Sequence, residues 1–333
     1  MINVGLIGHG NISKSHIGAY KHIIEDGVEL KIAAVCDIRP EVFEDMGDAR
    51  TYTDIDEMLK AEAGKLDYVD ICLPTYLHCE AACKAMRAGF NVLSEKPMAL
   101  NLEQAQAMVD TAKETGKQFM VAHCCRFMGA AKYIKSVIES GELGPVRSAE
   151  FYREGGSRKP MGYQNWFRKK ELSGGAMLDL HIHDVDLINY LFGMPKAVSA
   201  VGTKVFPESG YDAMSVNYMY DNGIFVNAKC DWSIVGDRFN TRAIRVNFDG
   251  GYIFVDRSKD RAANVKVDGE GNMTDITDLC YMDMYYHEIC YFIDCLKNGK
   301  PVDFCPPEQS AQAVRIVMAE MKSADKNGER VIV

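Results

Sequence analysis

The chain has 333 residues, of which 47% are hydrophobic and 26% charged, and its formal net charge is −9. This composition is typical of a globular protein, and the length suffices for two domains. The negative charge argues against nucleic acid or an acidic membrane as a partner, and no apolar run is long enough to span a bilayer.

The cysteines and the N-terminus bear on compartment and metal content. The 11 cysteines are an odd number, and their spacing suits neither a disulfide framework nor a metal site. The chain enters an apolar strand at once, without the pattern of a cleavable signal. We therefore expect reduced thiols, no bound metal and a cytoplasmic location.

The first 37 residues predict a strand, a glycine-rich turn, a helix and a second strand. Residues 2–7 and 30–36 are the apolar strands, and a helix between them should run to about residue 26. Gly8 permits the sharp turn, Gly10 permits close approach of a pyrophosphate, and Asp37 can accept hydrogen bonds from a ribose diol. The unit therefore predicts dinucleotide binding; the alternative is an ordinary strand-to-helix turn.

This unit departs from the usual pattern at one position. The third glycine of the G-x-G-x-x-G pattern is replaced by Ser13. That position serves close packing of the helix against the strand, so a small residue can substitute for glycine at modest cost. The departure leaves the prediction unchanged.

Strands and helices continue to alternate up to residue 122. Further strands are expected at residues 49–52, 68–73, 91–94 and 118–122. Helices are expected at residues 40–47, from about 53, 78–87 and 102–115. This alternation predicts a parallel sheet with helices on both faces, whose ligands lie beyond the carboxyl ends of the strands. The glycine turn, Asp37, residues 74–78 and residues 95–97 should therefore share one edge.

From residue 123 onward the pattern changes to period-two strands between turn signals. Strands are expected at residues 146–152, 197–205, 215–220, 224–232, 243–248, 252–255 and 264–267, and helices at 130–140, 284–297 and 307–326. We therefore expect a second domain, residues 123–333, of the α+β type, built on a large, mostly antiparallel, open-faced sheet, after a first domain of residues 1–122.

Glu95-Lys96-Pro97 follows a predicted strand and could carry chemistry. Pro97 favours extended geometry at the preceding residue, which holds Lys96 at the end of the strand. An ammonium there can hydrogen-bond a substrate hydroxyl and stabilise negative charge that develops on it. The alternative is a solvated surface lysine.

Residues 175–192 predict a helix that carries several histidines and acids. His181 and His183 are two apart, so on a helix they point in roughly opposite directions, which argues against a shared metal. Asp179 and His183 are four apart and should share a face, where the carboxylate would orient the imidazole as a general base or acid. The alternative is a buried structural pair. For His181 we expect either a structural role or a place just behind the residues that contact the substrate.

These motifs together resemble those of the Gfo/Idh/MocA oxidoreductases. The resemblance extends over nearly the whole chain and is carried by Gly8-x-Gly10-x-Ile12, Pro74-Thr75-x-x-His78, Glu95-Lys96-Pro97, Arg126-Phe127, Gly141-x-Leu143-Gly144, Trp166 before Gly174-Gly175, and Asp179-x-x-x-His183. It implies an N-terminal Rossmann domain that binds a nicotinamide cofactor, and a C-terminal sheet whose open face often packs against a partner subunit. It also implies that Lys96, Asp179 and His183 form the catalytic group. Many members have glycine at His181 and a polar residue at Cys125, so no member's substrate can be transferred.

The expected cofactor contacts lie at the strand ends and at the start of the second domain: Gly8, His9, Gly10, Asn11, Ile12, Asp37, Ile38, Arg39, Leu73, Pro74, Thr75, His78, Glu95, Lys96 and Arg126. The substrate candidates are Trp166, Arg168 and Tyr286. NAD is expected over NADP, because Asp37 would repel a 2′-phosphate, although Arg39 could pair with one.

The expected activity is that of an NAD-dependent dehydrogenase acting on a secondary alcohol of a sugar, sugar derivative or cyclitol. The alternatives are a redox-neutral glycosidase that retains its NAD and a non-catalytic sensor of cofactor or sugar. We also expect a homodimer or homotetramer, joined through one face of the C-terminal sheet. Candidates for that face are Val198, Val216, Tyr218, Phe225 and Val246.

The segment from residue 153 to residue 170 is basic in an otherwise acidic protein. It contains Arg153, Arg158, Lys159, Arg168, Lys169 and Lys170 against the single acid Glu154. It predicts either a solvated loop or a contact with an anionic substrate such as a nucleotide sugar or a uronate. A neutral sugar or cyclitol is the expectation if the loop is only solvated.

Overall fold

A computed structural model describes residues 1–44, 46–156, 162–235, 240–258, 263–280 and 283–333. The chain divides into two compact units, one made of Met1–Cys124 with Asp283–Ala311, the other of Cys125–Met282 with Gln312–Val333. The predicted domain boundary after residue 122 lies two residues before the point, after Cys124, where the chain first passes from one unit to the other. The return of residues 283–311 to the first unit was not anticipated.

The first unit contains a six-stranded parallel sheet in the order β3-β2-β1-β4-β5-β6. Its strands are β1 Ile2–Ile7, β2 Leu30–Cys36, β3 Arg50–Tyr52, β4 Tyr68–Ile71, β5 Asn91–Glu95 and β6 Phe119–Ala122. The order reverses between β1 and β4, which is where such sheets bind ligands. The predicted doubly wound sheet is thereby confirmed.

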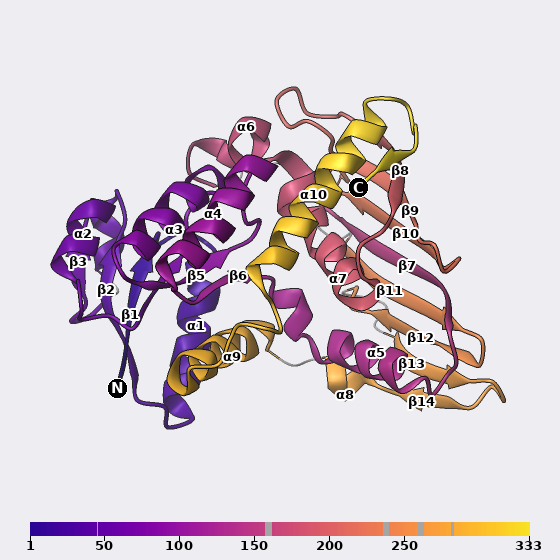
Figure 1. The fold of residues 1–333 in the computed structure, drawn as a ribbon, viewed down its shortest axis with the longest axis horizontal. Helices are drawn as coiled ribbons and strands as arrows, with labels where there is room; N and C mark the ends of the chain where they lie inside the picture. The colour runs from indigo at the N-terminus through magenta and orange to yellow at the C-terminus, as the bar shows by residue number, and fades with distance from the viewer. Residues whose placement is uncertain (45, 157–161, 236–239, 259–262, 281–282) are drawn as a thin grey trace. The chain divides into compact units, whose positions relative to one another are not determined.

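Helices cover both faces of this sheet. They are α1 Ser13–Glu25, α2 Ile55–Ala61, α3 His78–Arg87, α4 Leu102–Thr115 and α9 Met284–Asn298, with short 3₁₀ turns η1 Pro40–Phe43, η2 Thr75–Leu77 and η3 Cys124–Phe127. Figure 1 shows α1 and α9 on one face and α2, α3 and α4 on the other. Since both faces are covered, the strands are almost continuously apolar and buried. The helix expected at residues 40–47 is only the turn η1.

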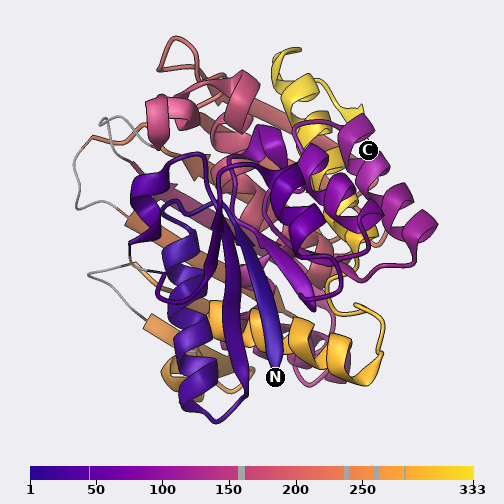
Figure 2. The same ribbon diagram turned by 90° about the vertical axis from the view of Figure 1, so that its left-hand side faces the viewer.

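Local signals explain where these helices begin and end. Asn101 caps α4, because its side chain accepts a hydrogen bond from the Gln104 amide at 2.9 Å. Gly116 then ends the helix in the left-handed conformation, with φ of 64°. Asp283 caps α9 in the same way, accepting from the amides of Tyr285 and Tyr286. Figure 2 shows α9 beside α1 in this unit.

The second unit contains a nine-stranded, mostly antiparallel sheet in the order β14-β13-β12-β11-β7-β10-β9-β8-β15, in which only β7 and β10 pair in parallel. Its strands are β7 Val146–Gly155, β8 Ala197–Thr203, β9 Ala213–Met219, β10 Phe225–Asp231, β11 Asn240–Phe248, β12 Gly251–Asp256, β13 Ala263–Asp268, β14 Met273–Asp275 and β15 Val331–Ile332. The short strands β14 and β15 were not predicted, but the fold class is confirmed.

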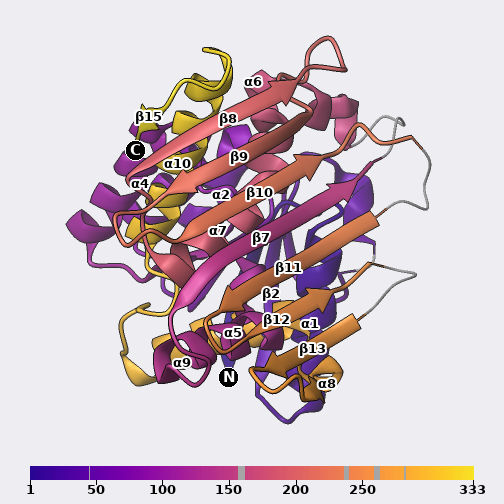
Figure 3. The same ribbon diagram turned by 90° about the vertical axis from the view of Figure 1, so that its right-hand side faces the viewer.

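Helices of the second unit lie behind one face of this sheet in Figure 3. They are α5 Gly129–Ser140, α6 Lys170–Ser173, α7 Ile182–Phe192, α8 Thr277–Cys280 and the larger part of α10 Pro307–Ala324, with a π-helical turn η5 Met177–His181 and a 3₁₀ segment η4 Tyr163–Arg168. Of the described residues, no helix is long and apolar enough to cross a membrane.

The outer face of the second sheet is polar, which corrects the expectation of an apolar one. Val198, Val216, Tyr218 and Val246 are all buried on the helix side, and of the candidates only Phe225, 51% exposed, faces outward. The outer side chains instead pair across strands. Arg245 donates to Glu150 at 2.5 Å, Lys229 contacts Glu154 at 2.6 Å, and Asn227 donates to Asn217 at 2.9 Å.

Candidate active site

The glycine turn of the first unit has the geometry expected for phosphate binding. Gly8 has φ of 93°, and an added Cβ would lie 2.7 Å from the Cys72 carbonyl oxygen, so only glycine fits. A Cβ on Gly10 would meet no atom of the chain within 4 Å, so the space beside its backbone is open to a ligand. Ser13 is buried and donates its hydroxyl to the Gly10 carbonyl oxygen at 2.8 Å. The Ser13 hydroxyl therefore has a hydrogen-bond acceptor at the position where the G-x-G-x-x-G pattern has glycine.

The N-terminus of α1, directly after this turn, is suited to an anion. The capping residue Ile12 offers no side-chain hydrogen bond, and the first turn contains no acidic residue. Backbone N–H groups at such an end carry partial positive charge and attract phosphate. The turn and the helix start therefore fit the pyrophosphate of a dinucleotide.

Asp37 follows β2 and is tied back to the glycine turn. Its carboxylate accepts from the His9 amide at 2.8 Å and from the Arg39 amide and Nε at 2.9 Å each. Arg39 also donates to the His9 carbonyl oxygen at 3.0 Å. Burial alone would raise the pKa of Asp37, but these donors outweigh it and hold the pKa below its usual range. Asp37 is therefore an anion paired with Arg39.

The ends of β4 and β5 carry the next predicted residues. His78 is buried, and its two ring nitrogens lie 2.8 Å from the carbonyl oxygens of Leu73 and Pro97. It thus connects the segments that follow the two strands. Lys96 comes directly after β5, is partly exposed, and precedes Pro97 through a cis peptide bond. Thr75 is buried in η2, at the same edge of the sheet.

A buried histidine lies beneath this edge and was not predicted. His16 of α1 contacts Asp70 of β4 through Nδ1 at 2.8 Å and Glu95 of β5 through Nε2 at 2.9 Å. Burial alone would lower the pKa of His16, but the Asp70 carboxylate and the Cys72 side chain together outweigh burial and raise the pKa well above its usual value. The signal in the sequence was Asp70, an acid within the apolar strand Tyr68–Ile71, because a buried carboxylate needs a partner.

Tyr286 lies away from the glycine turn. Its hydroxyl donates to Asp26 at 2.6 Å, and Asp26 is the residue that caps the C-terminal end of α1. Since α1 has 13 residues, that end lies about 20 Å from the helix start. This position within the first unit does not support the expected substrate contact.

In the second unit, the helix predicted from residue 175 starts with the π turn η5 before it continues as α7. Asp179 lies in η5 and His183 in the first turn of α7, so the spacing of an ideal α-helix does not apply between them. Both side chains are partly exposed in a segment that is otherwise largely buried. π turns are frequent at functional sites. Asp179 and His183 therefore stay candidate site residues because both are partly exposed, and no longer because of their spacing.

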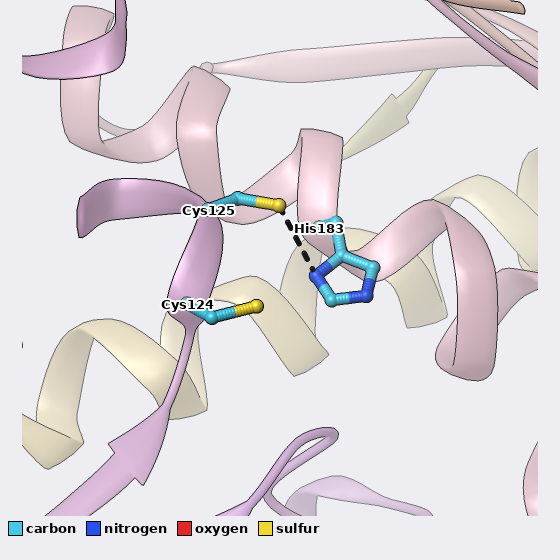
Figure 4. A group of neighbouring side chains, drawn as sticks. All are labelled: Cys124, Cys125 and His183. Atoms are coloured by element: carbon cyan, nitrogen blue, oxygen red, sulfur yellow. Dashed lines mark hydrogen bonds between the residues drawn. The ribbon is translucent and has the colours of Figure 1, made fainter. Parts of the chain in front are cut away.

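His183 contacts a thiol. Its Nδ1 lies 3.6 Å from the Sγ atom of Cys125 (Figure 4). Arg153 donates to the same sulfur at 3.8 Å. A histidine that takes up a proton at Nε2 must carry hydrogen on Nδ1, which then donates to the sulfur. With Nδ1 carrying the hydrogen that faces the sulfur, Nε2 would be the nitrogen of His183 that can accept a proton.

His181 points elsewhere, as predicted from its spacing to His183. It is fully buried, and its Nε2 lies 3.3 Å from both the Tyr218 hydroxyl and the Glu320 carboxylate. Burial alone would lower the pKa of His181, but the carboxylate of Glu320 outweighs burial and raises it. This environment is that of a structural residue.

Arg126 and Arg153 form buried ion pairs with two acids of α7, the helix that carries His183. Arg126 is fully buried and donates to both carboxylate oxygens of Asp186 at 2.7 Å. Arg153 donates to Asp184 at 3.0 and 2.7 Å. Arg126 therefore has a structural partner, and a cofactor contact for it stays a prediction.

Part of the basic segment is held inside the second unit. The Arg168 guanidinium is buried over the ring of Phe206 at 3.9 Å and that of Trp232 at 4.8 Å. Trp166 is partly exposed and stacks on Phe167, with ring centroids 4.0 Å apart. Arg158 and Lys159 lie outside the described residues.

Two family models match the chain. A model described as "Oxidoreductase family, NAD-binding Rossmann fold" matches residues 2–123, and one described as "GFO/IDH/MocA C-terminal domain" matches residues 131–254.

Named relatives match over part of their length. A 2,7-anhydro-N-acetylneuraminate hydratase from Mediterraneibacter gnavus is 32% identical over 60% of this chain and 53% of its own. A D-glucoside 3-dehydrogenase from Escherichia coli is 32% identical over 63% of this chain and 59% of its own. The chain thus spans somewhat more than half of each.

The fold has a counterpart among solved structures. Levoglucosan dehydrogenase in complex with NADH and levoglucosan superposes with a TM-score of 0.86, at 24% identity, over 100% of this chain and 99% of that one. This likeness extends over both units, as the two family models do. The chain belongs to the Gfo/Idh/MocA oxidoreductase family.

Proposed function

We propose that the protein is an NAD-dependent dehydrogenase that oxidises a secondary alcohol of a sugar, sugar derivative or cyclitol. The observation that supports this most is in the first unit. The glycine turn, the uncapped start of α1 and the carboxylate of Asp37 occur with Lys96 at the carboxyl ends of one parallel sheet. Relatives that are named as sugar dehydrogenases add support.

In this proposal the residues around the turn bind the cofactor. Gly8–Ile12 and the start of α1 would hold the pyrophosphate, and Asp37 would accept from the adenosine ribose. Bound NAD supplies the carbon that accepts a hydride. The Asp37–Arg39 pair would have to open or shift for Asp37 to accept both ribose hydroxyls, since Arg39 already donates to both of its oxygens.

The proposed catalytic group is Lys96, Asp179 and His183. Lys96 would donate a hydrogen bond to the substrate oxygen and stabilise the negative charge that develops as the alcohol loses its hydrogens. His183 would take the hydroxyl proton at Nε2, with Nδ1–H directed to Cys125. Asp179 would orient His183 or bind a neighbouring hydroxyl.

We propose a neutral rather than an anionic substrate. Arg153 and Arg168, two of the positive charges of the basic segment, are buried and engaged within the second unit. A polyhydroxylated ligand suits the remaining candidates, because each desolvated hydroxyl needs its own partner. Simple aliphatic alcohols should therefore be poor substrates.

The test is a panel of neutral sugars, matched uronates and sugar phosphates, and cyclitols, each assayed with NAD for the formation of NADH. The proposal expects NADH in proportion to the ketone formed, and a lower KM for neutral than for anionic sugars. A redox-neutral reaction is the second candidate, because two relatives are named as hydratases. Turnover of substrate without net NADH would favour that candidate and contradict a dehydrogenase.

We further propose self-association through the outer face of the second sheet. That face carries polar cross-strand pairs with isolated apolar side chains such as Phe225 and Val201, 51% and 56% exposed. Light scattering of the wild type and of Phe225→Lys tests this. A dimer or larger assembly that weakens in the variant is expected, and a monomeric wild type would contradict it.

A further inference from the structure

His16 joins three elements of the first unit around one ring. It comes from α1, and its nitrogens contact Asp70 of β4 and Glu95, the last residue of β5. His16 and Asp70 are fully buried and Glu95 is 3% exposed. Tyr285 of α9 packs against the ring, with centroids 5.8 Å apart. The ring is thus enclosed at a point where the ends of two strands meet a helix.

The contacts of this cluster identify its protonation state. Asp70 Oδ2 also accepts from the Tyr20 hydroxyl at 2.7 Å, and the Tyr68 hydroxyl donates to that of Tyr20 at 2.9 Å. With both carboxylates ionised they can only accept, so the ring between them would donate through both nitrogens, as an imidazolium does. The raised pKa of His16 agrees with this assignment.

The same contacts argue against a metal ion in this cluster. His16, Asp70 and Cys72 have donor atoms within 4.8 Å of one another, as a metal site would. However, Nδ1 of His16 lies only 2.8 Å from Asp70 Oδ2, which is the length of a direct hydrogen bond. A proton therefore takes the position that a bridging cation would need.

Glu95 connects the cluster to the candidate catalytic lysine. One oxygen of Glu95 accepts from His16, and the other accepts from the backbone amide of Lys96 at 3.1 Å. Glu95 therefore turns toward the interior and holds the peptide group from which the Lys96 side chain projects. Small displacements of a catalytic group have large effects on rate.

We propose that His16 is a positioning residue for Lys96: its ring clamps Asp70 and Glu95, and Glu95 in turn fixes the backbone of Lys96. The proposal rests on the proposed function, in which Lys96 contacts the substrate oxygen. Without the positive ring, two buried carboxylates would lose the partner that they share, and Glu95 would be held less firmly against the Lys96 amide.

The test uses two variants, His16→Gln and Glu95→Gln, with Tyr68→Phe as the matched control. His16→Gln removes the charge and one of the two donors. Glu95→Gln keeps the volume, but its single amide oxygen cannot take the place of both carboxylate oxygens, one of which faces His16 and the other the Lys96 amide. Tyr68→Phe removes a hydroxyl at the far end of the same network and leaves the contacts of Glu95 intact. Melting temperature establishes that each variant is folded.

The first readout is hydrogen exchange at the Lys96 amide, which does not depend on activity. Exchange should accelerate about tenfold or more in both variants but not in Tyr68→Phe, because loss of a hydrogen bond to a fixed acceptor opens that amide locally. The second readout is steady-state kinetics. We expect kcat to fall about tenfold to a hundredfold, with KM and the Kd for NADH much less affected.

Each outcome decides one part of the proposal. Unchanged exchange at Lys96 in both folded variants would overturn the clamp. Faster exchange with an unchanged kcat would overturn its role in positioning for catalysis. A wild type that oxidises no polyol would refute the proposed function, and the exchange readout would still decide whether His16 fixes Lys96.

Discussion

The two units hold their candidate catalytic side chains by different electrostatic means. In the first unit, Lys96 follows a carboxylate that is bound to a titratable ring, His16. In the second, His183 directly precedes Asp184 on α7, where Asp184 and Asp186 pair with Arg153 and Arg126. The guanidinium groups are charged at every accessible pH, whereas the imidazole is not. We therefore expect the position of Lys96 to respond to the protonation of His16, whereas the arginines of the second unit keep their charge.

The largest expected effects come from removing the two side chains themselves. Lys96→Met and His183→Asn should each lower kcat by roughly 10²–10⁴, the range for losing one acid–base or charge-stabilising group. The Kd for NADH should change much less, which fluorescence titration measures. Loss of activity together with a collapsed melting temperature would instead mean that the residue is structural.

Breaking the Arg126–Asp186 pair should cost stability rather than catalysis. Arg126→Met leaves a buried carboxylate without its partner, so we expect the free energy of unfolding to fall by about 3–5 kcal/mol in urea titrations. The double variant Arg126→Met with Asp186→Leu should recover part of this lost stability, because neither charge of the pair is then left buried without a partner. A loss of NADH affinity in a stably folded double variant would support a cofactor contact for Arg126 instead.

Cofactor preference should respond to Asp37 and Arg39 in opposite directions. NAD should bind about tenfold or more tightly than NADP, since Asp37 repels a 2′-phosphate. Asp37→Ala should narrow that ratio, and Arg39→Ala should widen it, because Arg39 can offset the carboxylate's charge. Competitive titration with both cofactors measures the ratio. Equal or tighter binding of NADP by the wild type would contradict the role given to Asp37.

The pH dependence of stability should differ between wild type and His16→Gln. The folded-state pKa of His16 is raised by Asp70, so its stabilisation is fully present below the unfolded value of about 6.5 and is lost as pH rises through the folded value. Each unit of that shift corresponds to about 1.4 kcal/mol. Urea titrations of both proteins from acidic to alkaline pH test this. A difference that grows with rising pH would have the wrong sign.

The smallest effect is expected at Cys125. Sulfur is a weak hydrogen-bond acceptor, so Cys125→Ala should change kcat by less than about threefold, provided that Asp179 or solvent can orient the His183 ring. The rate of the variant across pH is the measurement. A much larger loss would mean that the thiol holds the tautomer of His183.

The sequence predicts the glycine turn and the strand ends well because their chemistry is local. Gly8, Asp37 and Lys96 each follow an apolar strand directly, and parallel strands bring such residues to one edge. The segment around Asp179 was harder, because the α-helical spacing assumed for it does not hold across the π turn η5. Asp70 and His16 are far apart in sequence, so the pattern could not predict their contact. The one indication was that Asp70 is an acid within an apolar strand and therefore needs a buried partner.

The two faces of the second sheet show the same limit of prediction from sequence. Period-two patterns predicted most of its strands, yet alternation alone could not say which set of side chains the helices cover. Tyr218 and Phe225 both fitted an outward face by pattern, and only Phe225 lies there. The covered face is the one against which helices α7 and α10 pack. Helix α10 begins about a hundred residues after the start of β9, the strand that carries Tyr218.

Transfer of deuterium from substrate to cofactor tests the central claim most directly. The protein would be incubated with NAD and sugars or cyclitols that carry deuterium on the carbinol carbon, and the nicotinamide product would be analysed by mass spectrometry. The account predicts NADH that bears one deuterium, formed together with the matching ketone, and far less of both products from Lys96→Met in the same time. A folded protein that binds NADH but transfers no deuterium from any member of the panel would contradict it.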